Sequence, residues 1–289
     1  QARHRAGVGW RLGHARRGGA VGWRLGQARR GGGVGGRRRR GWVGVGGGAG
    51  VAGAASAYRL AEMGLRVLVL EKEATYAQGS TGKSAAGVRV QFSEPLNVLL
   101  SYRSILEYRE IPEAAYRPTG YLFLVPEAQA EAQEEALRVQ KALGVPVEKL
   151  SLAEAQRKVP FREEGLAYAT FGPMDGTIDP HGATAYYLRE ARRLGAEMRF
   201  SEPLLRAERR EGVWRVETPK GLYEAPFLLL CTGAWTGEVG RTLGLEIPVQ
   251  PVRRMVFATA PTPFPHAFPL TVDLGTGFYF RSEGSRLVK

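Results

Sequence analysis

The chain has 289 residues, of which 44% are apolar and 24% charged, a balance that is typical of globular proteins and excludes a wholly disordered chain. No apolar run approaches the length of a membrane-spanning helix, so we expect no membrane span. The formal net charge of +13 comes from residues 1–41, which contain 12 arginines and no acidic residue, whereas residues 42–289 contain 29 basic and 28 acidic side chains. The charge therefore does not indicate a nucleic-acid partner for the main part of the chain.

The first 41 residues form an Arg/Gly-rich extension that repeats itself, because the pattern of residues 9–19 returns at residues 22–32. Glycine raises the entropic cost of ordering and arginines repel one another, so we expect this extension to be disordered. One hypothesis makes it a nucleic-acid-binding arm in which Trp10 and Trp23 stack on bases. We favour the alternative, an extension without a function of its own.

Cysteine and histidine are scarce, which limits the chemistry that side chains can supply. The single cysteine, Cys231, excludes an internal disulfide framework and a cysteine-rich metal site. Few cysteines are compatible with the reducing cytoplasm, where we expect the protein to lie. His181 lies near Asp179, but an aspartate at a helix start beside an exposed histidine explains this pair, so we expect no metal ion.

A glycine-rich turn, GAGVAG at residues 48–53, follows a short apolar run at 42–45. The pattern after the turn predicts a helix over 54–63, ended by Gly64, and then an apolar strand over 65–70. This strand, turn, helix and strand end at the acidic residue Glu71, as the dinucleotide-binding fingerprint requires.

Each residue of this fingerprint has a physical role. Gly48 permits the tight turn, and Gly50 lets the backbone approach a diphosphate that the helix N-terminus then stabilises. Gly53 lets the helix pack closely on the first strand, and Glu71 is placed to accept hydrogen bonds from a ribose. The same fingerprint serves nicotinamide and flavin cofactors, so an NAD-dependent dehydrogenase is one alternative.

A second segment rich in small and hydroxylated residues, GSTGKSAAGVRVQF, occupies residues 79–92. Such residues let a backbone press against a flat ring or a phosphate. The segment does not satisfy the P-loop pattern, because Ala77 stands where that pattern needs a glycine.

The turn segment, the segment at 79–92 and LLLCTGAW at 228–235 together resemble the D-amino-acid-oxidase-like FAD-dependent oxidoreductases. The resemblance is to the branch with sarcosine oxidase β-subunits, dimethylglycine-type enzymes and dye-linked proline dehydrogenase β-subunits. It covers about residues 45–289, with further matches at 117–125, 174–182 and 277–281. The resemblance implies FAD as the cofactor, a small amine or amino acid as the substrate, and other subunits of a hetero-oligomeric oxidase or dehydrogenase as partners.

The resemblance also implies which residues bind FAD: the first glycine turn and Glu71 at the ADP half, the second segment near the flavin, and two further short segments. The implied cofactor-binding residues are Gly48, Gly50, Val51, Ala52, Gly53, Glu71, Lys72, Ser80, Thr81, Gly82, Ser84, Ala85, Ala86, Gly87, Leu204, Leu205, Thr232, Gly233 and Ala234. We expect Leu204 and Leu205 in a short strand near the adenine, and Trp235 and Cys231 in packing.

Later elements follow from periodicity and turn residues. We expect helices at 96–109, 127–143 and 180–194, a short helix after a capping box at 151–154, and strands at 121–125, 214–218, 222–225, 227–230, 252–259 and 277–281. The fold class is α/β. A Rossmann-like FAD-binding domain with a parallel sheet (42–115 and 176–245) is interleaved with an α+β substrate domain of mixed or antiparallel sheet (116–175 and 246–289).

Oxidation of an amine needs a hydride acceptor, and because no side chain can serve, the flavin supplies it. The protein orients the substrate and favours the neutral amine, so no dedicated base is required and no catalytic residue is assigned. Arg89 follows the flavin segment and is a candidate partner for a substrate carboxylate. Tyr279 and Arg281 alternate with phenylalanines along one strand and are the other candidates for substrate contact.

The family pattern continues past the position of Lys289, with a stretch that completes the substrate domain. We therefore expect that domain to be incomplete here, and FAD to bind weakly. An inactive, truncated flavoprotein with a nucleic-acid-binding basic tail is the remaining alternative.

Overall fold

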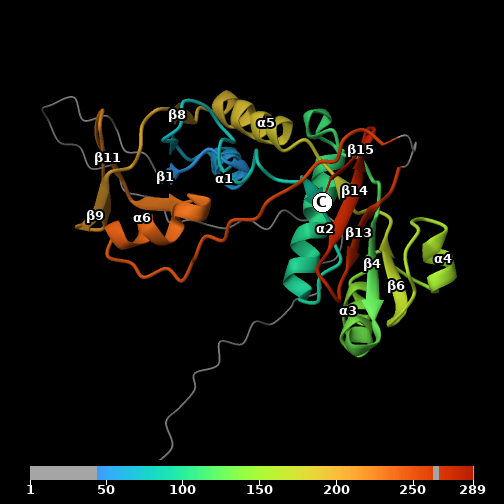
Figure 1. Cartoon of the computed structure of the whole chain (residues 1–289). Coiled ribbons are helices and arrows are strands. Elements are labelled where there is room, and N and C mark those ends of the chain that lie inside the picture. Colours follow the sequence, from blue (N-terminus) through green and yellow to red (C-terminus); the bar gives the residue numbers. More distant parts are fainter. Residues whose placement is uncertain (1–43, 263–266, 289) are drawn as a thin grey trace, which may run out of the picture. The chain divides into compact units, whose positions relative to one another are not determined.

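The computed structural model describes residues 44–262 and 267–288, which belong to one compact unit, Arg40–Lys289 (Figure 1). The repeats of residues 1–41 and the expected disorder there lie outside the described residues, as does the start of the strand predicted at 42–45.

A four-stranded parallel sheet carries the glycine turn. Its strands lie in the order β12-β1-β2-β8. They are β1 (Gly44–Gly47), β2 (Val67–Leu70), β8 (Glu197–Arg199) and β12 (Phe227–Leu230). Every residue of β2 is buried, as expected for a strand with both faces covered.

Two helices, α1 (Val51–Glu62) and α5 (Pro180–Arg193), lie side by side in Figure 1 and share one core cluster. Ala54, Ala57 and Ala61 form a stripe of small buried residues along α1, so the two helices can approach closely. The Asp179 side chain accepts the His181 N–H at 2.9 Å, which confirms the expected helix start.

A three-stranded antiparallel sheet of β9 (Arg206–Arg210), β10 (Val213–Thr218) and β11 (Gly221–Ala225) follows β8. The predicted hairpin around Gly221 is confirmed. The predicted strand at Leu204 and Leu205 is wrong: both residues precede β9 in a segment without secondary structure, because Leu205 makes only one backbone bond to that sheet. The helix α6 (Thr236–Thr242) comes after β12 and a 3-10 turn at Gly233–Trp235.

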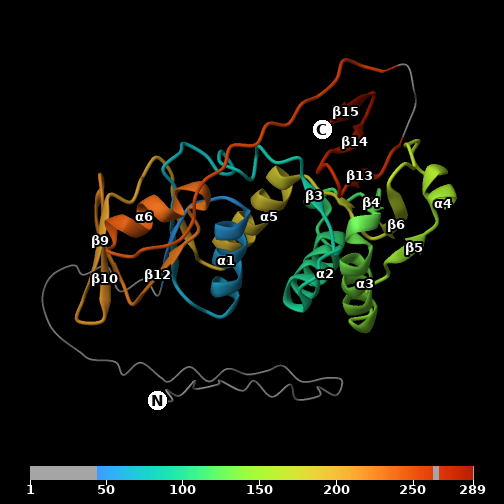
Figure 2. The ribbon, with the colours of Figure 1, turned by 60° about the horizontal axis from the view of Figure 1, so that its bottom comes forward.

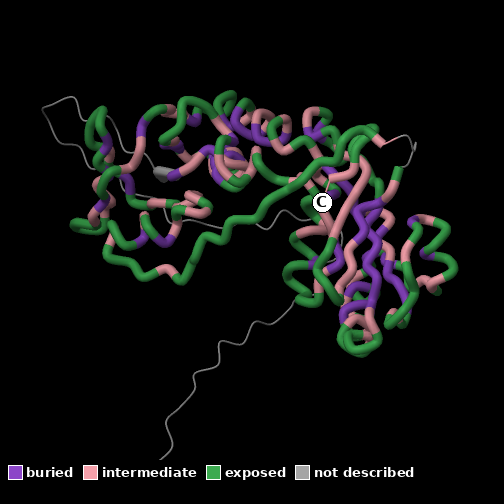
Figure 3. The backbone as a smooth tube through the Cα atoms, in the orientation of Figure 1, coloured by how far each residue is buried: buried purple, intermediate pink, exposed green. Residues whose placement is uncertain are grey.

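A six-stranded mixed sheet has the order β15-β14-β13-β4-β6-β5. Only the β13–β4 pairing in it is parallel. The strands are β4 (Tyr121–Pro126), β5 (Glu148–Leu150), β6 (Leu166–Gly172), β13 (Leu270–Asp273), β14 (Tyr279–Glu283) and β15 (Arg286–Val288). Buried residues concentrate in β4 and β6 at its centre (Figure 3).

The helices α2 (Pro95–Arg109) and α3 (Ala130–Ala142) run beside each other near this sheet (Figure 2). Val98 and Ile105 of α2, Leu137 of α3 and Val125 of β4 share a buried cluster. The short helix α4 (Leu152–Gln156) has the predicted capping box, and 3-10 turns occupy Pro112–Ala114 and Glu127–Gln129. A two-stranded pairing joins β3 (Gly87–Val88) to β7 (Gly176–Thr177).

The described elements agree with the predicted α/β class, while the division into two interleaved domains stays a prediction. The strand predicted at 252–259 is wrong. In that segment only Ala258 forms a bridge, to Val288, and Val252 and Met255 are exposed. A run of apolar residues does not become a strand without a partner that satisfies its backbone groups. Over the described ranges, no helix is both long and apolar enough to cross a membrane.

We predict that Gly53→Ala destabilises the fold. Alanine inside a helix is normally favoured by about 1 kcal/mol, but here a Cβ atom would lie 2.0 Å from the Gly48 carbonyl oxygen. That contact forces α1 away from the turn, and we expect a net loss of roughly 1–3 kcal/mol in urea unfolding. Ala52→Ser, at an exposed neighbour on the same helix, should change stability by less than about 0.5 kcal/mol. An unchanged unfolding midpoint for Gly53→Ala would contradict the close approach.

Candidate functional site

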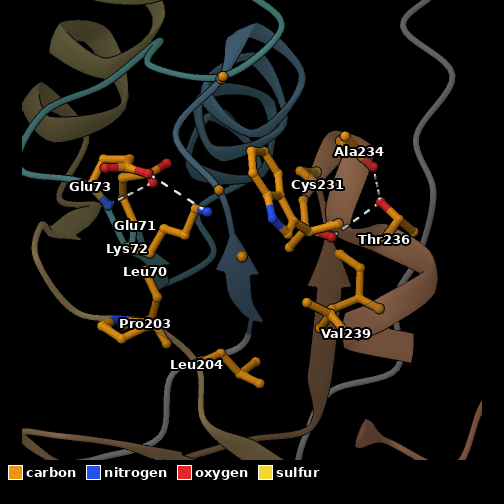
Figure 4. Close-up of a pocket in the computed structure, with 18 of the residues that line it drawn as sticks. Leu70, Glu71, Lys72, Glu73, Pro203, Leu204, Cys231, Ala234, Thr236 and Val239 are labelled. Carbon is orange, nitrogen blue, oxygen red and sulfur yellow. Dashed lines mark hydrogen bonds and ion pairs between the residues drawn. The ribbon is translucent and has the colours of Figure 1, made fainter. Parts of the chain in front are cut away.

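A cavity of about 570 Å³ lies where β1, β2 and β12 end. Figure 4 shows the last residue of β2, Leu70, and the residues after it up to Glu73 on one side, and residues that follow β12, from Cys231 to Val239, on the other. Pro203 and Leu204 close it below in that view. Carboxyl ends of parallel strands are where open α/β sheets bind ligands, and the volume suits an organic cofactor.

The first glycine of the turn touches the end of β12. Gly48 has a φ of +106°, and a Cβ atom there would lie 2.5 Å from the Cys231 carbonyl oxygen. Its N–H donates to the Leu70 carbonyl at 2.8 Å, so the turn is bound to β2 as well. Only glycine has both the conformation and the space that this position requires.

The N-terminus of α1 faces the cavity. Gly50 is the N-cap and offers no side-chain acceptor, so backbone N–H groups of the first turn are available to an anionic group. One of these N–H groups is bound by the second loop, residues 79–92, because the Val51 N–H donates to Thr81 Oγ1 at 3.1 Å. A Cβ atom at Gly50 would lie 3.0 Å from the same oxygen, which shows how closely the two loops meet.

Glu71 holds the glycine turn from the end of β2. Its Oε2 accepts the Ala49 N–H at 2.6 Å, and its Oε1 accepts the Glu73 N–H at 2.9 Å. Each carboxylate oxygen has a second lone pair, so the group can still accept from hydroxyls of a ligand. Glu71 therefore both shapes the turn and lines the cavity.

An aromatic side chain borders the same cavity. Trp235 is 40% exposed, and the Lys72 ammonium lies 3.6 Å from the centroid of its ring, a cation–π contact. The expectation that Trp235 and Cys231 serve in packing is therefore incomplete, because both line the cavity. Burial raises the pKa of the Cys231 thiol, which disfavours a reactive thiolate.

Most of the predicted cofactor residues line this cavity. They are Gly48, Gly50, Val51, Ala52, Glu71, Lys72, Ser80, Thr81, Leu204, Leu205, Thr232, Gly233 and Ala234. Six others do not line it: Gly53, Gly82, Ser84, Ala85, Ala86 and Gly87. Sequence reasoning missed Gln78, Pro203, Thr236, Glu238, Val239 and Thr242, among others. The helical spacing of Glu238, Val239 and Thr242, just after the third motif, is the signal that could have found α6.

The later part of the second loop needs small residues because of its own packing. A Cβ atom at Gly82 would lie 2.2 Å from the Ala77 carbonyl oxygen, and one at Gly87 would lie 1.7 Å from the Tyr121 hydroxyl. Ala86 has a φ of +60°, a conformation that side chains rarely adopt. Contacts within the chain thus account for these positions, whatever they also do for a ligand.

A second cavity, of about 350 Å³, opens beside β3 and contains Arg89. Its walls include the aromatic residues Phe92, Tyr108 and Tyr121. The Arg89 guanidinium carbon lies 4.6 Å from the ring centroid of Phe92 and 5.4 Å from that of Phe123. Burial raises the pKa of Tyr121 to about 12, so its hydroxyl stays protonated and can donate a hydrogen bond.

The other two candidates for substrate contact lie near Tyr121. Tyr279 packs against the cluster that contains Tyr121, and both Arg281 and Arg89 act electrostatically on the Tyr121 hydroxyl. Arg281 donates to the Ala85 carbonyl at 3.2 Å and pairs with Glu283. Because Arg281 is already engaged in these contacts, Arg89 is the better candidate for an anionic substrate group.

A buried carboxyl lies next to Arg89. Asp175 is fully buried, and burial raises its pKa to about 7, from an ordinary value of 3.8, against the opposing effects of hydrogen bonds from Gln91 and Val90 and of the Arg89 charge. The hydroxyls of Tyr116 and Tyr121 are the other titratable groups that sense it.

We predict that Asp175 makes stability depend on pH. The folded-state pKa lies above the ordinary value, so the folded chain binds this proton more tightly than the unfolded chain. Its contribution is present at low pH and is lost as pH rises through about 7. Between about pH 5 and 8, the free energy of unfolding in urea should fall more steeply for the natural chain than for Asp175→Asn. Parallel curves for the two proteins would refute the assignment.

The comparisons with known proteins identify the family. Residues 48–288 match the sequence model of the DAO family, the FAD dependent oxidoreductases. The chain belongs to this family. The match confirms the resemblance and the α/β fold class, and it favours FAD over a nicotinamide cofactor.

Individual relatives agree with this assignment. The chain is 29% identical over 286 residues to "FAD-dependent oxidoreductase domain-containing protein 1" of Xenopus laevis, covering 82% of this chain and 57% of that protein. It is 31% identical over 212 residues to a monomeric sarcosine oxidase of Streptomyces avermitilis, covering 70% of this chain and 54% of that protein. The crystal structure of L-proline dehydrogenase from P. horikoshii matches with a TM-score of 0.78 and 25% identity, covering 86% of this chain and 69% of that one. The chain thus spans little more than half the length of the two curated relatives.

The residues around the first cavity fit the ADP half of FAD. Gly48 and Gly50 leave backbone exposed where a diphosphate needs close approach, and the N-terminus of α1 faces the same space. Glu71 supplies the carboxylate at the end of the second strand.

Proposed function

We propose that the chain oxidises the C–N bond of a small amine or amino acid with FAD as its cofactor. The observation that carries the proposal is the cavity at the ends of β1, β2 and β12, where a glycine turn, a helix N-terminus and Glu71 converge. The dinucleotide fingerprint has the same three parts. Family membership supports a flavin as the bound cofactor.

When bound, FAD supplies the hydride acceptor that no side chain can provide. The chain's own residues hold and orient the two reactants. Gly48, Gly50 and Glu71 bind the ADP half of the cofactor, and Ser80 and Thr81 line the same cavity. The guanidinium charge of Arg89 and the aromatic side chains beside it favour a neutral amine over an ammonium ion.

For the substrate we propose a small amino acid of the sarcosine, glycine or proline type. Arg89 supports this choice, because a guanidinium in a half-buried, aromatic-walled cavity suits a carboxylate. The relatives named for sarcosine and L-proline support it as well. Tyr121, which keeps its proton, can donate a further hydrogen bond to the bound substrate.

The test is an equilibrium titration of the purified chain with FAD, because titration also detects weak complexes. We expect saturable changes in the visible spectrum, followed by loss of the oxidised-flavin absorbance when sarcosine, proline or glycine is added without oxygen. Glu71→Gln should weaken FAD binding roughly 10- to 100-fold, the value of one or two charged hydrogen bonds. Glu197→Gln, at a carboxylate on β8 outside the cavity, should bind like the natural chain. Absence of FAD binding, or bleaching by none of the three compounds, would overturn the proposal.

We predict that Arg89→Met raises KM for the active amino acid roughly 100-fold, because loss of a charge-assisted hydrogen-bonded pair costs about 2–3 kcal/mol. The change should be much smaller for an amine of the same shape that lacks a carboxylate, such as pyrrolidine in place of proline. Arg103→Met removes an exposed arginine from α2 and serves as the control. Equal losses for proline and pyrrolidine would show that Arg89 does not bind the carboxylate.

We propose a cytoplasmic location, in keeping with a single cysteine in 289 residues.

We also propose that the protein joins other subunits of a hetero-oligomeric oxidase or dehydrogenase. Exposed apolar side chains, including Val252 and Met255, support a covering partner.

A further inference from the structure

Asp175 is a buried carboxylate with two hydrogen-bond partners on residues 87–92, called here the Arg89 segment. Its Oδ1 accepts the Val90 N–H at 2.7 Å, and its Oδ2 accepts a hydrogen bond from Gln91 Nε2 at 3.0 Å. Both donors lie within two residues of Arg89. The Asp175 side chain is completely buried, so these bonds do not compete with solvent.

The backbone just before Arg89 is paired with the residues that directly follow Asp175. Val88 of β3 pairs with Gly176 of β7, the residue after Asp175. The backbone is therefore fixed before Arg89 by a strand pairing and after it by a carboxylate. Gly172 makes room for this arrangement, because a Cβ atom there would lie 2.2 Å from Asp175 Oδ2.

Gln91 extends the contact into the six-stranded sheet. Its Nε2 also donates to the Tyr121 carbonyl at 3.1 Å, and its Oε1 accepts from the Thr170 hydroxyl at 2.8 Å. Gln133 donates to Thr170 at 3.2 Å. The Asp175 carboxylate is thus the end of a buried hydrogen-bond network that joins the Arg89 segment to β4 and β6.

No carboxylate among the described residues forms an ion pair within 4.0 Å with Arg89, although such a pair usually fixes an arginine side chain. The Arg89 guanidinium rests on the rings of Phe92 and Phe123. A cation–π contact allows a range of positions over the ring, whereas a hydrogen bond fixes both a distance and a direction. The backbone conformation at Arg89 is therefore one of the main constraints on where its guanidinium lies, together with the two rings.

We propose that Asp175 is a positioning residue for Arg89. Its carboxylate holds the Val90 amide and the Gln91 side chain, and so directs the guanidinium toward the carboxylate of the amino-acid substrate. This inference rests on the proposed function for its substrate, but the positioning itself is a property of the chain alone.

Asp175→Asn is the informative variant because it keeps the volume. An asparagine can still accept from Val90, but its NH₂ group then faces the NH₂ group of Gln91, and a flipped Gln91 loses its bond to Tyr121. Tyr168→Phe is the matched control. It removes a hydrogen bond of 2.8 Å to the Ala130 carbonyl from a buried side chain of β6 that shares an apolar cluster with Val90 but, among the described residues, forms no hydrogen bond to the Arg89 segment.

The first measurement is amide hydrogen exchange of the natural chain and both variants, at about pH 8 without added ligand. For Asp175→Asn we expect exchange in a peptide over residues 87–92 to rise at least roughly tenfold, with little change over residues 97–108. Tyr168→Phe should leave both peptides unchanged. Unchanged exchange over 87–92 in Asp175→Asn overturns the proposal, whether or not the chain oxidises any amine.

The second measurement separates positioning from general loss of structure. We expect Asp175→Asn to raise KM for the active amino acid roughly tenfold with kcat within about twofold, and to leave KM for the matched amine without a carboxylate unchanged. Equal effects on both compounds, or a fall in kcat alone, would contradict a role through Arg89. If Asp175→Asn fails to fold, Thr170→Val tests the same network from its far end, and it should raise exchange over 87–92 and KM in the same sense but by less. A Thr170→Val chain that matches the natural one in both readouts counts against the network.

Discussion

The structure around the first cavity depends on one close approach, that of the glycine turn to the end of β12. A Cβ atom at Gly48 would lie 2.5 Å from the Cys231 carbonyl, and one at Gly53 would lie 2.0 Å from the Gly48 carbonyl. These two contacts leave no room for any side chain. They bring three strand ends, the start of α1 and Glu71 to one place. A helix N-terminus and a carboxylate there can act on a diphosphate and a sugar only because the backbone is this compact.

Much of this arrangement could be predicted from the sequence, because local rules and tertiary structure agree. The turn at 48–53 combines a glycine spacing, a helix pattern and an apolar strand that ends at Glu71, and each demands the same geometry. The capping box at Ser151 and the hairpin around Gly221 are likewise determined by residues within a few positions of one another. The capping box and the hairpin therefore do not depend on distant partners.

The errors arise where distant partners decide the outcome. The apolar run at 252–259 has the composition of a strand, but apart from one bridge it lacks a neighbouring strand, and only the fold shows this. Contacts with Ala77 and Tyr121 require small residues at Gly82 and Gly87, which the sequence alone could not show, and the predicted approach of these glycines to a flavin stays a prediction. The buried network around Asp175 joins residues 30 to 85 positions apart, so no local sequence pattern predicts it. The hydrophobic periodicity of a helix or strand predicts which of its faces is apolar, but it does not predict which polar side chains form hydrogen bonds in the core.

One contact has a consequence for the order in which the chain acquires its structure. Arg281 Nη2 donates to the Ala85 carbonyl across a sequence separation of 196 residues. During synthesis the loop before β3 emerges long before Arg281 does, and ribosomes add roughly 5–20 residues per second. The Ala85 carbonyl therefore cannot accept this hydrogen bond until roughly ten seconds or more after its own synthesis. A hydrogen bond between residues this far apart in the sequence forms only after the strand that carries the donor has been added to the chain.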